Sequence, residues 1–119
     1  MAKHNALGEL GEEMAVGYLS DKGYVILERN YRFDRAEVDI IAKDKDQIVI
    51  VEVKTRTSDF FGDPQEFVTP GKIKQLVKVA DHYLTSKEID KETRFDIVAI
   101  LVNKKEKSIE HFIDAFYHF

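Results

Sequence analysis

Apolar residues recur along the chain with two different periods, and their alternation predicts one domain that mixes helices and strands. Apolar positions at helical spacing predict a helix over residues 5–22 and a second helix that begins at Pro70, with Thr69 as its N-cap. Branched aliphatic runs predict strands over residues 24–32, 36–43, 47–55, 94–103 and 108–113. The order α-β-β-β-α-β-β predicts an α/β domain in which helices pack against a central mixed sheet that contains a hairpin.

Length and composition narrow the class of protein. The 119 residues are enough for a single domain over residues 1–119, and 44% hydrophobic with 34% charged residues is typical of a folded chain. The absence of cysteine excludes disulfides, a thiol nucleophile, iron–sulfur clusters and cysteine-ligated zinc. No apolar run approaches ~18 residues and no signal-peptide pattern opens the chain, so we expect a cytoplasmic protein with no membrane partner.

The charge balance argues against a protein that coats nucleic acids. Acidic residues exceed basic ones by 22 to 18, which gives a formal charge of −4, whereas such proteins usually carry a basic face. A weaker set of polar and basic residues is a candidate for phosphate contacts, with ordinary solvated surface as the alternative. This set comprises Arg56, Lys72, Lys74, Gln75 and Lys78.

Two charged residues, Glu52 and Lys54, interrupt the most apolar predicted strand. Side chains alternate along a strand, so both point to the same face, and buried charges are rare unless they are paired or bind a metal ion. Asp39 lies between apolar residues of the preceding strand, and a hairpin sets the two strands side by side. A turn centred at Lys45 places Asp39 opposite Val51, whereas a one-residue slip places it opposite Glu52.

This arrangement favours metal-assisted chemistry. Two converging carboxylates form a hard oxygen site for Mg²⁺ or Mn²⁺, and a nearby lysine can orient a water molecule and stabilise developing negative charge. Glu12 offers a third acid, because its helical neighbours are mostly small or apolar. Two alternatives remain open: Glu52 and Lys54 form an internal ion pair without catalysis, and Glu12 is an ordinary exposed helix residue.

Several motifs resemble the YraN-type family of uncharacterised bacterial proteins. They span nearly the whole chain and include residues 8–12 (GELGE), 37–42 (EVDIIA), 51–56 (VEVKTR), 61–64 (FGDP) and 94–98 (RFDIV). One departure is Ala36, which stands where the family usually has glycine. That family looks like a branch of the PD-(D/E)XK nuclease superfamily, close to archaeal Holliday-junction resolvases.

The resemblance implies a restriction-endonuclease-like three-layer fold. It also implies that Asp39, Glu52 and Lys54 match the catalytic acid, acid and lysine, and that Glu12 matches the helix glutamate that completes the metal site. We therefore expect a nuclease dependent on Mg²⁺ or Mn²⁺ that acts on nucleic acid, with DNA ranked ahead of RNA. Branched or repair intermediates are candidate substrates, and a homodimer is a compatible state. The alternatives are a non-catalytic module that binds nucleic acid or protein on the same scaffold, and a structural protein.

The histidines and the remaining aromatic residues add little to this hypothesis. Phe60 and Phe61 either anchor a loop or stack on unpaired bases. The histidines show no metal-ligand spacing and are expected to be non-catalytic; they are His4, His82, His111 and His118. The C-terminal aromatics are expected to pack or to form a dimer contact; they are Phe112, Phe116, Tyr117 and Phe119.

Overall fold

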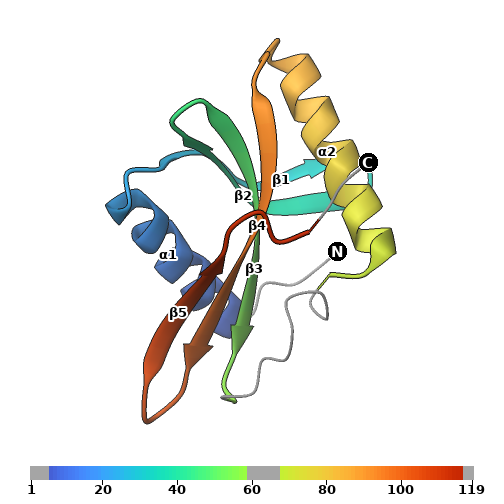
Figure 1. Cartoon of the computed structure of the whole chain (residues 1–119). Helices are drawn as coiled ribbons and strands as arrows, with labels where there is room; N and C mark the ends of the chain where they lie inside the picture. The colour runs from blue at the N-terminus through green and yellow to red at the C-terminus, as the bar shows by residue number, and fades with distance from the viewer. Residues whose placement is uncertain (1–5, 59–67, 117–119) are drawn as a thin grey trace.

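Five strands form one mixed sheet in the computed structural model, which describes residues 6–58 and 68–116 (Figure 1). The sheet order is β1-β2-β3-β4-β5, antiparallel except for the parallel pair β3 and β4. The elements are α1 (Ala6–Asp21), β1 (Val25–Phe33), β2 (Ala36–Asp44), β3 (Gln47–Arg56), α2 (Pro70–Ser86), β4 (Glu92–Val102) and β5 (Lys107–Phe112). The predicted order α-β-β-β-α-β-β and the central mixed sheet flanked by helices are therefore confirmed.

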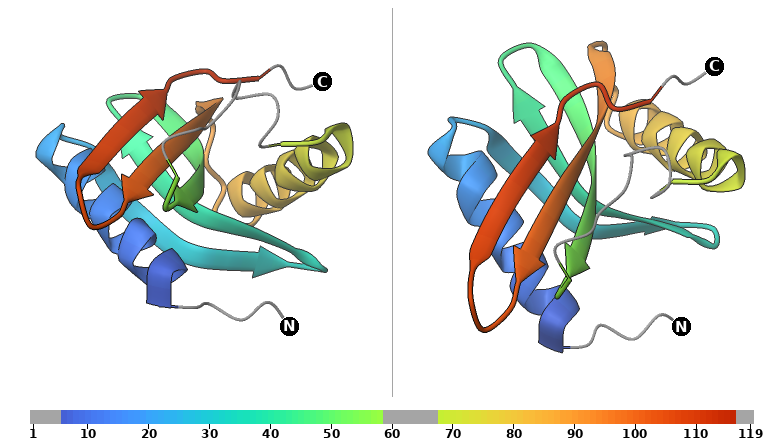
Figure 2. Two further views of the ribbon diagram at one scale, coloured as in Figure 1. Left: turned by 90° about the horizontal axis from the view of Figure 1, so that it is seen from below. Right: turned by 60° about the horizontal axis from the view of Figure 1, so that its bottom comes forward.

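The two helices cover opposite faces of the sheet, as the further views in Figure 2 show. Alternate residues of β3 belong to different cores: Ile48 and Ile50 pack in the core that contains α2, whereas Val49 and Val51 pack in the core that contains α1. Burial on both faces explains why the sequence of β3 is a nearly continuous aliphatic run. Its parallel pairing with β4 requires a crossover connection, and α2 supplies it.

The hairpin of β2 and β3 sets the register of the two candidate carboxylates. A two-residue turn joins the strands, and Lys45 in it adopts a left-handed φ of 54°. Ile40 pairs with Val51, so Asp39 lies level with Glu52. The expectation of a turn centred at Lys45 with Asp39 opposite Val51 is wrong, because the turn has two residues at its tip rather than one; the alternative one-residue slip describes the register.

The two strands of this hairpin separate just beyond that last pair. Ile40 and Val51 end the ladder, although both strands continue and β3 reaches Arg56. In the gap the Val53 amide donates a hydrogen bond to Asp39 Oδ2 at 2.8 Å. A side chain thus replaces the main-chain acceptor that β2 no longer supplies, and the sheet is locally open between β2 and β3.

Gly11 lets helix α1 lie directly on β3. A Cβ atom built at Gly11 would overlap the side chain of Thr55, whereas one built at Gly17 of the same helix would meet nothing within 4 Å. The close approach at Gly11 matters for the site because the next residue along the helix is Glu12.

We expect Gly11→Ala to destabilise the protein by about 1–3 kcal/mol, because α1 must move away from β3 to accommodate the added methyl group. Gly17→Ala is the matched control and should stabilise the protein by about 0.5–1 kcal/mol through its higher helix propensity. Urea denaturation of the two variants measures the difference. Equal stabilisation by both changes would mean that α1 is not held against Thr55.

A buried ion pair, Arg94 and Asp96, ties β4 to the elements around it. Asp96 is fully buried, and Arg94 donates to both of its carboxylate oxygens, at 3.0 Å through Nε and 2.9 Å through Nη2. Burial raises the pKa of Asp96, but hydrogen bonds from His111 and Arg94 outweigh it and lower that pKa below its ordinary value. The other partners of the pair lie within 3.1 Å; they are Asp44, Gln47 and Tyr24 on Arg94, and His111 and the Asp114 amide on Asp96.

The aromatic residues near the C-terminus pack against the core that contains α2. Phe112 and Phe116 both contact that core, and the Phe116 ring lies 5.4 Å from the Phe95 ring, so the packing expected for them is confirmed. Six residues with sequence-based expectations lie outside the described residues: His4, Phe60, Phe61, Tyr117, His118 and Phe119. No helix within residues 6–58 and 68–116 has the length and apolar character needed to cross a membrane.

Candidate functional site

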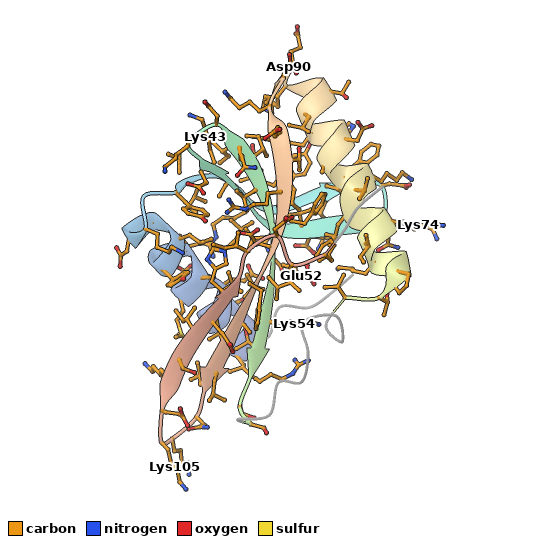
Figure 3. The ribbon with its side chains drawn as sticks, in the orientation of Figure 1. Lys43, Glu52, Lys54, Lys74, Asp90 and Lys105 are labelled. Atoms are coloured by element: carbon orange, nitrogen blue, oxygen red, sulfur yellow. The ribbon has the colours of Figure 1, made fainter. Side chains whose placement is uncertain are left out.

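Asp39 and Glu52 meet where β2 and β3 separate. Asp39 is half-buried and is held by the Val53 amide, while Glu52 is only 7% exposed. The two acids lie level with each other on β2 and β3, and the charge of Glu52 acts on Asp39. Figure 3 shows Glu52 near the middle of the sheet and Lys54 farther along β3, toward its end. The hairpin therefore brings together the two acids that the sequence placed on neighbouring strands.

A cation from helix α2 pairs with one oxygen of Glu52. Lys72 Nζ lies 3.6 Å from Glu52 Oε2. The other oxygen, Oε1, is buried and has no hydrogen-bond partner among the described residues. When Asp39 and Glu52 are both ionised, neither can donate to the other, so Oε1 stays without a donor. A buried carboxylate oxygen in this condition is costly, and a bound cation would satisfy it.

Burial and mutual repulsion keep these carboxyl groups from ionising easily. Burial, followed by the charge of Glu52, raises the pKa of Asp39 from 3.8 to about 8, against the opposing effect of the Val53 amide. Burial likewise raises the pKa of Glu52, although Lys72 and Lys54 oppose the rise. Two carboxyl groups with raised pKa values at one place are typical of a functional site rather than of a stabilising ion pair.

Glu12 approaches the same place from α1. It is 8% exposed, and its Oε1 accepts a hydrogen bond from Asn30 Nδ2 at 3.0 Å. Asn30 has a left-handed φ of 52°, which asparagine tolerates better than most residues. The charge of Glu12 contributes to the raised pKa of Asp39. The structure thus buries Glu12 near the pair instead of exposing it on the helix surface.

The site opens into a cavity of about 340 Å³ with both signs of charge on its wall. Acidic side chains on the wall are Glu12, Glu37 and Asp39, and basic ones are Lys54, Arg56 and Lys72. Glu52 is not among the residues that line the cavity, but it pairs with Lys72, which is. A cavity of this kind can hold a cation against its acids and an anion, such as a phosphate group, against its bases.

Only two members of the weak phosphate-contact set reach the cavity. Arg56 and Lys72 line it, whereas Lys74, Gln75 and Lys78 are exposed on α2. Lys78 forms a surface ion pair 2.7 Å long, and Figure 3 shows Lys74 pointing outward from α2. These three residues lie away from the cavity, so phosphate contacts by them stay a prediction, with solvated surface as the alternative.

The donor set fits a divalent cation only in part. Within residues 6–58 and 68–116 no three His, Cys, Asp or Glu side chains form a ready-made metal cluster. Asp39 and Glu52 do supply two adjacent carboxyl groups, one buried oxygen without a donor, and negative charge that a dication would neutralise. Asn30 bonds to only one oxygen of Glu12, Oε1, and a carboxylate has lone pairs on both oxygens for further partners. Water would fill the remaining positions, which is common for Mg²⁺.

Three contributors to the site escaped the sequence analysis. Asn30 holds Glu12, Gly11 brings α1 onto β3, and Lys72 pairs with Glu52 in addition to standing at the cavity wall. Asn30 carried a signal, because a polar residue that favours turns interrupts a predicted strand. Lys72 carried none, since its contact with Glu52 depends on how α2 docks on the sheet.

Comparisons with known proteins place the chain among bacterial relatives of similar length. It matches the family model described as uncharacterised protein family UPF0102 over residues 11–100. UPF0102 proteins of Flavobacterium psychrophilum and Flavobacterium johnsoniae are 56% identical over 119 residues and 51% identical over 123 residues, with all of both chains covered. A UPF0102 protein of Chlorobium phaeobacteroides is 48% identical over 92% of each chain.

One solved structure shows a weaker likeness, that of Pyrococcus furiosus SfsA in complex with Ca²⁺. The TM-score is 0.41 and the sequence identity is 13%, over 90% of this chain and 62% of that chain.

Proposed function

Since the chain belongs to the uncharacterised protein family UPF0102, we propose its function from the site itself: a divalent-metal-dependent nuclease that hydrolyses phosphodiester bonds in DNA. The observation that carries the proposal is the pair of Asp39 and Glu52, with a buried carboxylate oxygen that has no donor among the described residues. Two mutually repelling acids beside a cavity destabilise a fold, and such arrangements are characteristic of functional sites.

In this proposal Asp39 and Glu52 hold Mg²⁺ or Mn²⁺, with Glu12 as a third ligand. The bound ion supplies Lewis-acid polarisation of the phosphodiester and lowers the pKa of a water molecule. The Val53 amide fixes the orientation of the Asp39 carboxylate, so the ligand geometry is set by the main chain of β3. Lys54 orients the attacking water and stabilises the negative charge that develops on the phosphate.

The charges on the cavity wall support a phosphate-bearing substrate. Lys54, Arg56 and Lys72 line the cavity, and in this proposal their positive charges contact the phosphates of the substrate. A formal charge of −4 disfavours tight binding along an extended duplex without a metal ion. We therefore take branched and repair intermediates of DNA as the first substrates to test; a homodimer stays a prediction.

The test is cleavage of labelled DNA by the purified full chain with Mg²⁺ or Mn²⁺. Branched, flapped and single-stranded substrates should be nicked, and Glu52→Gln should reduce the rate by about 10²-fold or more, because it removes a metal-binding charge while keeping the side-chain shape. RNA of the same structures is a parallel substrate.

Asp46→Asn provides the matched control, because the side chain of Asp46 is 98% exposed on the turn between β2 and β3. Its cleavage rate should equal that of the wild type. Equal residual cleavage by wild type and Glu52→Gln on every substrate would identify the activity as a contaminant and refute the proposal.

A non-catalytic binding module on the same scaffold is the second candidate. It is favoured by one observation, that Asn30 holds Glu12 and no three-acid cluster forms in the described part of the chain. Calorimetric titration with Mn²⁺ separates the candidates. Binding that is lost in Glu52→Gln supports the nuclease, whereas no binding at millimolar Mn²⁺ supports the module.

A further inference from the structure

Lys72 differs from every other lysine of helix α2 in what it contacts. It lies in the first turn of the helix, where its amide donates to the capping Thr69 hydroxyl at 3.2 Å, and its Nζ lies 3.6 Å from Glu52 Oε2. Lys74 and Lys78 in the same helix are exposed and do not border the cavity. The capped helix end fixes the backbone of Lys72, so only its side chain needs to move for the ion pair to break.

The position of Lys72 conflicts with a cation bound at the same carboxyl group. An ammonium group 3.6 Å from Glu52 repels a dication that binds there, because two positive charges would share one acid. The Lys72 side chain is 35% exposed and lines the cavity, so the ammonium group has a solvated place to go. Its long flexible stem makes that movement inexpensive.

We propose that Lys72 is a displaceable counter-ion: it pairs with Glu52 when no divalent cation is bound, and cation binding releases its ammonium group into the cavity to contact a substrate phosphate. The inference rests on the proposed function, since the same carboxyl group binds the cation. It adds a second role to the site, because the residue that compensates the acids in the metal-free protein becomes a positioning residue for the substrate. The Lys72 ammonium group thus pairs first with the Glu52 carboxylate and then with a substrate phosphate.

The first test measures Mn²⁺ affinity by calorimetry, in the same buffer for every variant. Lys72→Met removes the charge and keeps the stem, and it should bind Mn²⁺ on the order of tenfold more tightly than the wild type, because the competing cation is gone. Lys74→Met is the matched control, which removes an equal charge from the exposed face of α2 and should leave the affinity unchanged. A purely structural role for Lys72 would leave the affinity unchanged or weaken it.

The second test uses the wild-type protein and so does not depend on whether the variant folds. Modification by an amine-reactive reagent, read by mass spectrometry, should become several-fold faster at Lys72 when Mg²⁺ is added, and should stay constant at Lys74. In the presence of Ca²⁺, Lys72→Met should also bind a DNA oligonucleotide more weakly than Lys74→Met does.

The outcomes separate this inference from the proposed function. Mn²⁺ binding to the wild type, with no gain in Lys72→Met and no Mg²⁺ effect on Lys72 reactivity, overturns the counter-ion role and leaves the metal site standing. Absence of Mn²⁺ binding in every variant overturns both. Tighter binding in Lys72→Met together with a Mg²⁺-dependent reactivity of Lys72 supports the inference.

Discussion

Asp39→Asn is expected to stabilise the metal-free protein at alkaline pH by on the order of 2–4 kcal/mol. The substituted side chain keeps an oxygen that can accept the Val53 amide, so the local hydrogen bond survives. It loses the negative charge that lies beside Glu52 and close to Glu12. The same change removes a proposed metal ligand, so a more stable protein should also be one that no longer binds Mn²⁺.

The size of this effect depends on pH in a defined window. The pKa of Asp39 rises from 3.8 to about 8 on folding, so between these values the folded protein holds a proton that the unfolded chain has released. The metal-free wild type therefore loses stability as the pH rises through the window. The difference between Asp39→Asn and the wild type should be smallest at the acid end and largest at the alkaline end.

Urea denaturation across this pH range checks the prediction, with Asp46→Asn as the control. The exposed Asp46 should change stability by no more than about 0.5 kcal/mol at any pH. Added Mn²⁺ should raise the melting temperature of the wild type and of Asp46→Asn but not that of Asp39→Asn. If Asp39→Asn were no more stable than the wild type at alkaline pH, Asp39 and Glu52 would not repel each other as the structure indicates.

The second large effect concerns the fold and is far from the proposed chemistry. Arg94→Met should cost about 3–5 kcal/mol of stability, because it leaves the fully buried Asp96 without its charged partner. Asp44 and the Tyr24 hydroxyl lose a donor at the same time. The free energy of unfolding in urea measures the loss.

Two further variants make this result interpretable. Arg94→Lys keeps the charge but lacks the planar fork that makes two parallel hydrogen bonds to Asp96, so we expect a smaller loss and a protein that still folds. Arg35→Met removes an exposed arginine and should change stability by no more than about 0.5 kcal/mol. Comparable losses in Arg35→Met and Arg94→Met would show that the buried ion pair contributes little.

Most of the fold was predictable because the apolar pattern is strong in each element. The aliphatic run of β3 and the cap of α2 at Thr69 mark their elements directly. The resemblance to the YraN-type family is confirmed, because UPF0102 is that family. The register of the β2–β3 hairpin was harder to predict, because the polar residues around Lys45 show no apolar periodicity. A change of one residue in the length of the turn shifts every residue pair between the two strands.

For the site, the same local signal led to two different structures. An acid inside an aliphatic strand marked Glu52, which has an oxygen without a donor, but the same pattern surrounds Asp96, which is fully paired in the Arg94 network. The alternation of residues along a strand does not distinguish a buried acid whose oxygens are all hydrogen-bonded from one with an oxygen that lacks a donor. The difference lies in partners that arrive from elsewhere in the chain, such as Arg94 for Asp96 and Lys72 for Glu52.

The two-residue turn between β2 and β3 also bears on the order in which the site assembles during folding. Asp39 and Glu52 lie on one hairpin, and a hairpin can close within about 1–10 μs. Lys72 reaches Glu52 only when α2 docks as the crossover between β3 and β4, which is a slower, non-local event. We therefore expect the two acids to meet before their counter-ion arrives, which at alkaline pH leaves the charge of the hairpin uncompensated at that stage.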